Sequence, residues 1–224
     1  MQAFLKKYRL FIATLFVLSC IIITLFYNIL SPIKILPIYQ PAQVNYELVD
    51  SSIQHQKKYH HIKDFSLVNQ NGDTITQEFY RNKIYVADFF FTTCQTICPI
   101  MTDHMYEIQR KTISDPEVLL LSHSVIPEVD SVAQLKRYAL KKRVNASKWN
   151  LVTGDKEQIY ALARKSYLAV KEAGDGGVFD MIHTENFMLI DKKRQIRGFY
   201  DGTDPEEIER LLDDIKVLKA AYKN

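Results

Sequence analysis

The fold is decided by residues 84–99, IYVADFFFTTCQTICP, in which a hydrophobic run leads directly into two cysteines. Residues 84–91 are almost continuously apolar, which is typical of a strand buried on both faces of a sheet. A helical pattern follows, and Pro99 suits its first turn, where the missing N–H costs no hydrogen bond. Cys94 and Cys98 are therefore predicted to lie where a buried strand ends and a helix begins.

The sequence on both sides of this stretch alternates between strand and helix patterns. Asn71-Gly72 predicts a hairpin, since these residue types tolerate positive φ. Asp130 and Asp155 are expected to introduce two of the later helices. The order expected after the cysteines is a helix to residue 112, a strand at 118–125, a helix at 131–142, a short strand at 151–152, a helix at 155–166, a hairpin at 186–200 and a helix from 204. This order fits an α/β fold, a thioredoxin-like mixed sheet flanked by helices.

An uncharged segment, residues 10–30, precedes this domain and predicts a transmembrane anchor. As a helix it spans roughly 30 Å, the thickness of the hydrocarbon core of a bilayer. Lys6, Lys7 and Arg9 precede it, and cations on this flank favour a cytoplasmic N-terminus, residues 1–9, with the remainder exported. A cleaved signal peptide is the alternative, but its apolar region is usually shorter and ends in small residues.

Residues 31–60 contain three prolines and no sustained period, which predicts a linker before a domain at 61–224. His55, His60 and His61 fall at the end of this linker. Without a fixed scaffold they are expected to be solvated surface residues and not metal ligands. The net charge of +3, from 29 basic and 26 acidic residues, gives no argument for nucleic-acid binding.

The pair of cysteines suggests several kinds of chemistry. Cys20 lies within the expected membrane span, which leaves Cys94 and Cys98 in an exported compartment. Their spacing brings both sulfurs to one side of the first helical turn, where the partial positive charge favours thiolates. Three residues separate them, against two in thioredoxin-type redox motifs, and this leaves space for an ion. A structural disulfide, a redox dithiol and a metal site all remain open. Two thiolates and an imidazole would suit Cu(I) and also hold Cu(II), whereas structural zinc would need a fourth ligand.

This stretch resembles the SCO/SenC family, which are copper chaperones for the assembly of cytochrome c oxidase. The similar motif is FTxCxxxCP at residues 91–99, and the family has a histidine at some distance, just before a strand. His183 occupies that place, 85 residues after Cys98. Residues 190–200 also look like the closing hairpin of the family. The resemblance covers roughly residues 60–220.

The resemblance implies a copper site formed by Cys94, Cys98 and His183, in a periplasmic domain held at the inner membrane by a single span. It implies a metallochaperone more than an enzyme. The partner would be the copper-bearing subunit of cytochrome c oxidase, which holds a dinuclear copper centre, together with a copper donor or a thiol reductase. The alternative is a membrane-anchored thiol–disulfide oxidoreductase that acts on the cysteines of the oxidase or on other exported thiols. In it Cys94 and Cys98 would be the catalytic pair, and loss of His183 would be tolerated.

Other residues near the motif have simpler explanations. Met101 and Met105 are expected in the core. His104 is expected on the surface because its position turns it away from the sulfurs. His123 lies in an apolar strand and is expected to be a core or edge histidine. Asp88, inside the buried strand, needs a partner, or its pKa rises.

Overall fold

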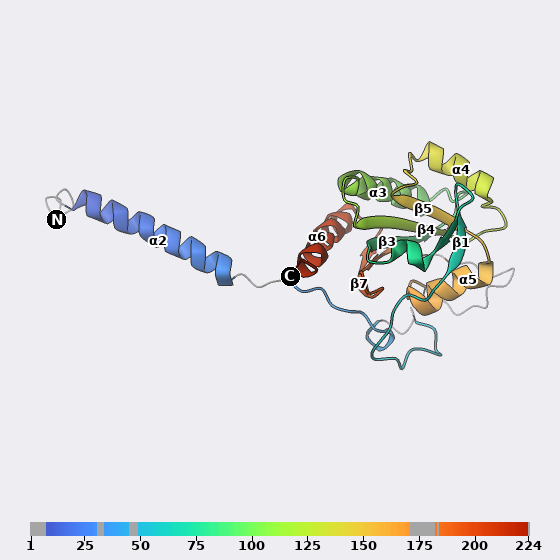
Figure 1. Ribbon diagram of the computed structural model, residues 1–224, viewed down its shortest axis with the longest axis horizontal. Coiled ribbons are helices and arrows are strands. Elements are labelled where there is room, and N and C mark those ends of the chain that lie inside the picture. Colours follow the sequence, from blue (N-terminus) through green and yellow to red (C-terminus); the bar gives the residue numbers. More distant parts are fainter. Residues whose placement is uncertain (1–7, 31–33, 45–48, 171–181, 183, 224) are drawn as a thin grey trace. The chain divides into compact units, whose positions relative to one another are not determined.

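The computed structural model describes residues 8–30, 34–44, 49–170, 182 and 184–223 (Figure 1). The chain divides into two compact units, Met1–Ile35 and Leu36–Asn224, and each is described by itself. The predicted ligand His183 lies outside the described residues.

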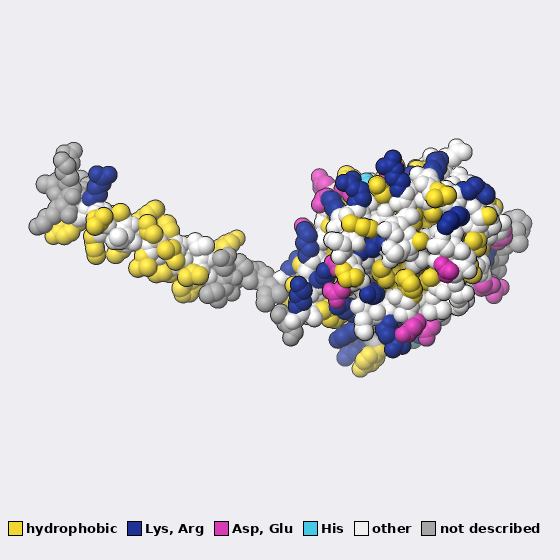
Figure 2. Space-filling view, turned by 45° about the horizontal axis from the view of Figure 1, so that its top comes forward, with side chains coloured by type: hydrophobic (Ala, Val, Ile, Leu, Met, Phe, Trp, Pro, Cys, Tyr) yellow, Lys and Arg dark blue, Asp and Glu magenta, His cyan; other side chains and the backbone are white. Residues whose placement is uncertain are grey.

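In its described residues, the first unit contains one helix, α2 (Arg9–Leu30). Hydrophobic side chains run along it (Figure 2), and it is long and apolar enough over Arg9–Tyr27 to cross a membrane. Two of its hydroxyl groups donate to carbonyls of the preceding turn, Thr14 to Phe11 and Thr24 to Cys20. Such internal bonding removes the cost of placing a hydroxyl in hydrocarbon.

The second unit is built around a seven-stranded mixed sheet in the order β2-β1-β5-β4-β3-β6-β7. Strands β3, β4 and β5 run parallel, while β1 pairs antiparallel with β5 and β6 pairs antiparallel with β3. The thioredoxin-like α/β prediction is confirmed. The strands are β1 (Ser66–Asn69), β2 (Thr74–Thr76), β3 (Ile84–Phe90), β4 (Val118–Ser124), β5 (Trp149–Thr153), β6 (Asn186–Ile190) and β7 (Ile196–Asp201).

Helices cover both faces of the sheet (Figure 1). One face packs against the apolar sides of α3, α4 and α6, and the other packs against α5 and the turn that continues it. Every residue of β3 is buried, with Val86 and Phe90 on the first face and Ala87 and Phe89 on the second. The bounds are α3 (Ile97–Thr112), α4 (Val132–Lys141), α5 (Lys156–Ala161), its π-helical continuation (Leu162–Ser166) and α6 (Pro205–Ala221), with the 3₁₀ turns η1 (Pro41–Gln43) and η3 (Gln77–Tyr80).

Described residues before β1 pack against the domain, and the second compact unit starts at Leu36. Leu36 is buried in the core on the α6 side. The Arg197 guanidinium donates to the carbonyls of Leu36, at 2.6 Å, and of Pro37, at 2.8 Å. The Tyr39 N–H donates to the carbonyl of Ile196. These contacts join residues far apart in the sequence, which explains why local pattern indicated only a linker.

His60 corrects the expectation of a solvated histidine. Its side chain is 3% exposed, and its Nε2 lies 2.8 Å from the carbonyl oxygen of Ser166. Burial lowers the pKa of its imidazole. His55, by contrast, is exposed as expected.

Candidate metal and thiol site

The two cysteines lie where β3 passes into α3, as predicted. Cys94 is in the loop between the two elements and is half-buried, whereas Cys98 is the second residue of α3 and is 3% exposed. Both are free thiols. The helix starts at Ile97, between the two sulfurs, so its N-terminal amides face the site.

The loop that carries Cys94 is fixed by a buried carboxylate on the neighbouring connection. Asp130, fully buried after β4, accepts from the backbone N–H of Thr92 at 3.1 Å and from the Thr92 hydroxyl at 2.5 Å. It also accepts from the Ser124 hydroxyl at 2.6 Å. The Thr92 hydroxyl in turn accepts from the Gln134 amide. Charge-assisted hydrogen bonds of this kind are the strong ones, so the loop is held rigidly against β4 and α4.

The role of Asp130 differs from the one expected of it. The sequence suggested that it introduces α4, but the N-cap is Ser131, whose hydroxyl accepts from the backbone N–H of Gln134. Asp130-Ser131 offers two capping residues in succession, and sequence pattern does not show which of them caps the helix. The contact to Thr92 spans 38 residues and leaves no local signal.

The Cys94 sulfur takes the place of a capping group at the start of α3. Thr96 is the N-cap, but its hydroxyl makes no capping bond and lies 3.5 Å from the Cys94 sulfur. Partial burial raises the pKa of the Cys94 thiol, but this is outweighed by hydrogen bonds from the Thr96 hydroxyl and from the backbone N–H groups of Cys98 and Thr96. The net result lowers its pKa to about 7. Cys94 is thus substantially thiolate at neutral pH.

Cys98 has the opposite character. Burial raises the pKa of its thiol, only partly offset by a hydrogen bond from the backbone near Phe91, and the charges of Cys94 and Asp88 raise it further, to about 12. Within α3, the Thr102 hydroxyl donates to the Cys98 carbonyl at 2.7 Å. The site therefore pairs a reactive Cys94 thiolate with a Cys98 thiol that stays protonated at neutral pH.

The third predicted ligand, His183, falls in a gap of the described chain, so its place relative to the sulfurs stays a prediction. Within the described ranges, no group of three or more His, Cys, Asp or Glu side chains is arranged to hold a metal ion. The two cysteines can supply the soft sulfur ligands that Cu(I) prefers.

The nearby histidines do not join the two sulfurs. His123 is fully buried and stacks on Phe89, with ring centroids 4.8 Å apart. Phe89 belongs to the core on the opposite face of the sheet from Cys98, so His123 is a core histidine, as expected. His104 is half-buried, and its Nδ1 lies 2.7 Å from the Gly202 carbonyl oxygen.

Asp88 and the two methionines lie beneath the site. Met101 and Met105 are fully buried, as predicted. Asp88 is 1% exposed, and burial raises the pKa of its carboxyl to about 7, although a hydrogen bond with Ser122 lowers it in part. The carboxyl is therefore close to half-protonated at neutral pH, which agrees with the rise expected of a buried acid.

Comparison with known proteins identifies the family. A family model described as SCO1/SenC matches residues 53–220. The SCO1 protein homolog of Bacillus subtilis (strain 168) is 31% identical over 157 residues, covering 69% of this chain and 81% of that protein. BsSco, described as a member of the Sco family of cytochrome c oxidase assembly proteins with a disulfide switch, has a solved structure that is 30% identical with a TM-score of 0.60. That match covers 71% of this chain and 93% of the other.

A copper-bound relative has also been solved. The structure of Bradyrhizobium japonicum ScoI with copper bound is 26% identical, with a TM-score of 0.55, and the match covers 70% of this chain and 99% of that one. The fold, the range matched by the family model and the sequence identity to these relatives all indicate the same family. The chain therefore belongs to the SCO1/SenC family.

Proposed function

We propose that this protein binds copper through Cys94, Cys98 and His183 and delivers it to the dinuclear copper centre of cytochrome c oxidase. The observation that carries the proposal is the pair of free thiols of unlike pKa at the start of α3. Family membership supports it, as do the copper-bound ScoI and the description of BsSco as an oxidase assembly protein.

The unlike thiols suit stepwise capture of a copper ion. Cys94, half-exposed and substantially ionised near pH 7, is the sulfur that meets incoming Cu(I) first. Cys98 is protonated until the metal replaces its proton, which balances the charge of a buried thiolate. Release to a partner reverses this order by ligand exchange, with the exposed sulfur giving up the ion last.

The surroundings of the site suit a protein recipient. Ile100, in the first turn of α3, is 46% exposed, and Val129, next to the Asp130 that fixes the loop, is 50% exposed. Exposed apolar side chains beside a functional group are typical of an interaction surface. Helix α2 would hold the domain on the outer side of the membrane in which the recipient subunit is also embedded. Such tethering raises the effective concentration of the two partners.

A thiol–disulfide oxidoreductase is the second candidate, and the same pair of thiols favours it. The Cys94 thiolate would attack a disulfide of the substrate and form a mixed disulfide, with one substrate sulfur leaving as a thiol. Cys98 would then lose its proton and displace the second substrate thiol, which leaves a Cys94–Cys98 disulfide. Two electrons pass to the substrate, and a thiol reductase would restore the dithiol. The disulfide switch described for BsSco supports this alternative.

An anaerobic Cu(I) titration of the reduced full-length chain in detergent, in competition with a chromophoric chelator, tests the proposal. Variants Cys94→Ser, Cys98→Ser and His183→Ala remove each ligand in turn. The matched controls are Cys20→Ser in α2 and His55→Ala, whose side chain is exposed.

The expected result is one copper per chain, with affinity lowered by more than about 100-fold in each ligand variant, since even residues that support ligands cost 10- to 100-fold. The controls should bind as the parent chain does. Copper binding that is indifferent to His183→Ala, with thiol–disulfide exchange intact, would overturn copper delivery and leave the oxidoreductase.

A further inference from the structure

The exposed face of α4 carries positive charge without any acidic side chain. Lys136, Arg137, Leu140 and Lys141 are exposed and recur at spacings of three and four residues, so they share one face of the helix. These four residues form the α4 stripe. Residues 131–148 contain six basic residues and no acid, whereas the whole chain has a net charge of +3. Figure 2, which brings the α4 side of the domain forward, shows Lys and Arg side chains there with few Asp or Glu among them.

The cations of the stripe contact neutral groups. Lys136 donates to the side-chain oxygen of Asn71, and Arg137 donates to that of Gln134. Across the described ranges, no carboxylate forms an ion pair with Lys136, Arg137 or Lys141. Arg137 and Lys141 are four residues apart, and like charges at that spacing destabilise a helix slightly. The stability of α4 therefore does not account for the pattern.

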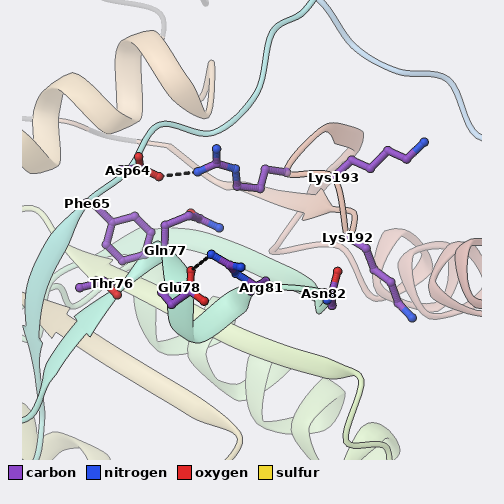
Figure 3. A pocket seen from close by; sticks show the side chains of 10 residues that line it. Asp64, Phe65, Thr76, Gln77, Glu78, Arg81, Asn82, Lys192 and Lys193 are labelled. Atoms are coloured by element: carbon purple, nitrogen blue, oxygen red, sulfur yellow. Dashed lines mark hydrogen bonds and ion pairs between the residues drawn. The ribbon is translucent and has the colours of Figure 1, made fainter.

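Other cation-rich parts of the domain carry carboxylates beside their cations. The pairs are, on α6, Arg210–Glu207 and Lys216–Asp213, and, in the pocket between residues 76–82 and 192–194, Arg81–Glu78 and Arg194–Asp64 (Figure 3). Exposed pairs of this kind contribute little to stability, but they cancel charge at the surface. The α4 stripe has no such cancellation, so it presents three positive charges to a partner.

Hydrogen bonds connect the stripe to the loop of the reactive thiol. The Gln134 amide donates to the Thr92 hydroxyl at 2.9 Å and accepts from the Arg137 guanidinium at 2.7 Å. Thr92 lies two residues before Cys94 in the same loop. A charge on the stripe is therefore two hydrogen bonds away from the segment that carries the Cys94 sulfur.

The other end of α4 meets α3 next to the second thiol. The ammonium of Lys142 donates to the carbonyl of Pro99, the residue after Cys98, at 3.2 Å. The Tyr138 hydroxyl lies 2.8 Å from the hydroxyl of Thr102, one turn further along α3. Because α4 is joined to both sides of the thiol site, a partner that binds the stripe takes a defined position relative to the two sulfurs.

We propose that the α4 stripe binds an acidic surface of the protein that receives copper from the thiols. This assignment rests on the proposed function and names the chemistry by which the site recognises its recipient. Carboxylates of the recipient pair with the three cations, while Leu140, 71% exposed, is covered by an apolar side chain of the recipient. Complementary charge of this kind raises association rates by roughly 10- to 1,000-fold and loses its effect as salt increases.

The connection to the thiols favours a protein over an anionic membrane surface as the occupant. Copper leaves Cys94 by ligand exchange, so the next ligands must come within bonding distance of that sulfur in the docked complex. A protein that is bound to Arg137 and Lys136 can place its own soft ligands there. A lipid headgroup offers the cations an anion but offers the copper ion no soft ligand.

The test measures association between the full-length chain in lipid nanodiscs and the copper-free exported domain of the oxidase's copper-bearing subunit. Stopped-flow fluorescence gives the association rate constant over a range of ionic strength. The test variant is Lys136→Gln with Arg137→Gln and Lys141→Gln. The matched control removes the same charge from exposed positions outside α3 and α4, as Lys57→Gln with Lys58→Gln and Lys193→Gln.

At low salt the test variant should associate roughly tenfold more slowly than the parent chain, with a weaker dependence on salt. The control should associate within about twofold of the parent chain, because its charges lie away from the docked surface. Leu140→Ala leaves the charge unchanged and should instead raise the dissociation rate, since apolar contacts act in the formed complex. Carbodiimide coupling, which joins amines to carboxylates in contact, should link Lys136 and Lys141 of the parent chain to Asp or Glu of the recipient.

Three results would overturn the proposal: no association of the parent chain, no slowing in the test variant, or equal slowing in the two triple variants. Hydrogen exchange over residues 132–141, measured without the recipient, tests lipid as the occupant. Exchange that slows when phosphatidylglycerol is added to phosphatidylcholine discs, together with no coupling to the recipient, would overturn the assignment to a protein.

The Cu(I) titration keeps this proposal separate from copper delivery. The test variant should bind copper as the parent chain does, because none of its changes touches a proposed ligand. A parent chain that fails to bind copper but still associates through the stripe would overturn delivery and leave the docking surface. Normal copper binding, with association indifferent to the stripe, would overturn the docking surface alone.

Discussion

The hydroxyl oxygen of Thr96 lies 3.5 Å from the sulfur of Cys94, although Thr96 is the N-cap of α3 and would ordinarily bond to a backbone amide of that helix. The sulfur accepts hydrogen bonds from the amides instead. A thiolate at this position satisfies helix donors and receives the favourable end of the helix dipole at the same time. This relationship makes Cys94 the reactive member of the pair.

The first prediction concerns the reactivity of Cys94. Its alkylation by iodoacetamide in the copper-free, reduced protein should be half-maximal near pH 7, because its pKa is lowered to about 7. Cys98, with a pKa raised to about 12, should stay unmodified across the same range. Peptide mass spectrometry after timed alkylation measures both sites.

Thr96→Val should move the Cys94 profile to higher pH, because it removes the hydroxyl that stabilises the thiolate. Thr93→Val, at an exposed position in the same loop, is the matched control and should leave the profile unchanged. A half-maximal rate near the ordinary thiol pKa of about 8.5 in the parent protein would contradict this account.

The second prediction concerns Asp130. Asp130→Asn replaces an acceptor of three hydrogen bonds by an amide whose NH₂ group faces the donors of Thr92 and Ser124. Loss of a buried, hydrogen-bonded charge should lower the free energy of unfolding by about 2–4 kcal/mol. Cu(I) affinity should fall as well, because the loop that carries Cys94 loses its support.

Urea unfolding and the copper titration measure the two effects. Asp155→Asn is the control, since this exposed N-cap accepts only from the backbone of Gln158 and asparagine caps about as well. A loss for Asp130→Asn no greater than that of the control would show that the buried carboxylate is dispensable.

The third prediction concerns pH and Asp88. The folded pKa of this carboxyl is raised to about 7 from its ordinary 3.8, so the folded state binds more protons between these values. The contribution of Asp88 to stability should therefore fall as pH rises through this window, by at most about 1.4 kcal/mol per pH unit, and level off above it. Asp88→Asn should remove that slope. The stability of this variant relative to the parent chain should therefore be higher at pH 8 than at pH 5.

Urea midpoints of the copper-free protein between pH 4 and 8 test this, with the exposed Asp103→Asn as the control that should keep the slope. If the slope of the parent chain persists in Asp88→Asn, another group is responsible for it.

The fourth prediction concerns the start of the domain. A fragment of residues 34–224 should be more stable than one of residues 44–224, by about 3 kcal/mol or more. The shorter fragment loses the burial of Leu36, worth about 2 kcal/mol, and two hydrogen bonds from Arg197, worth about 1 kcal/mol each. Urea unfolding of the two fragments measures the difference. Equal stability would mean that residues 36–43 act only as a linker.

Much of the fold could be predicted because its signals are local. The apolar run before Cys94 predicts a strand buried on both faces, and β3 is buried at every residue. Asn71-Gly72 predicts the hairpin of β1 and β2, and Asp204-Pro205 predicts the start of α6. Each of these depends on neighbours within a few residues, which is the range over which backbone preference and hydrophobic period operate.

What the sequence determined by itself is the order of the elements, the apolar N-terminal helix and the placing of Cys94 and Cys98 at a strand-to-helix junction. Only the tertiary structure decided that Asp130 supports the loop, that Leu36 packs in the core, and that the two thiols differ in pKa. Burial and hydrogen bonds set those properties, and their partners come from distant parts of the chain. Sequence spacing alone does not show which distant groups meet in the folded protein.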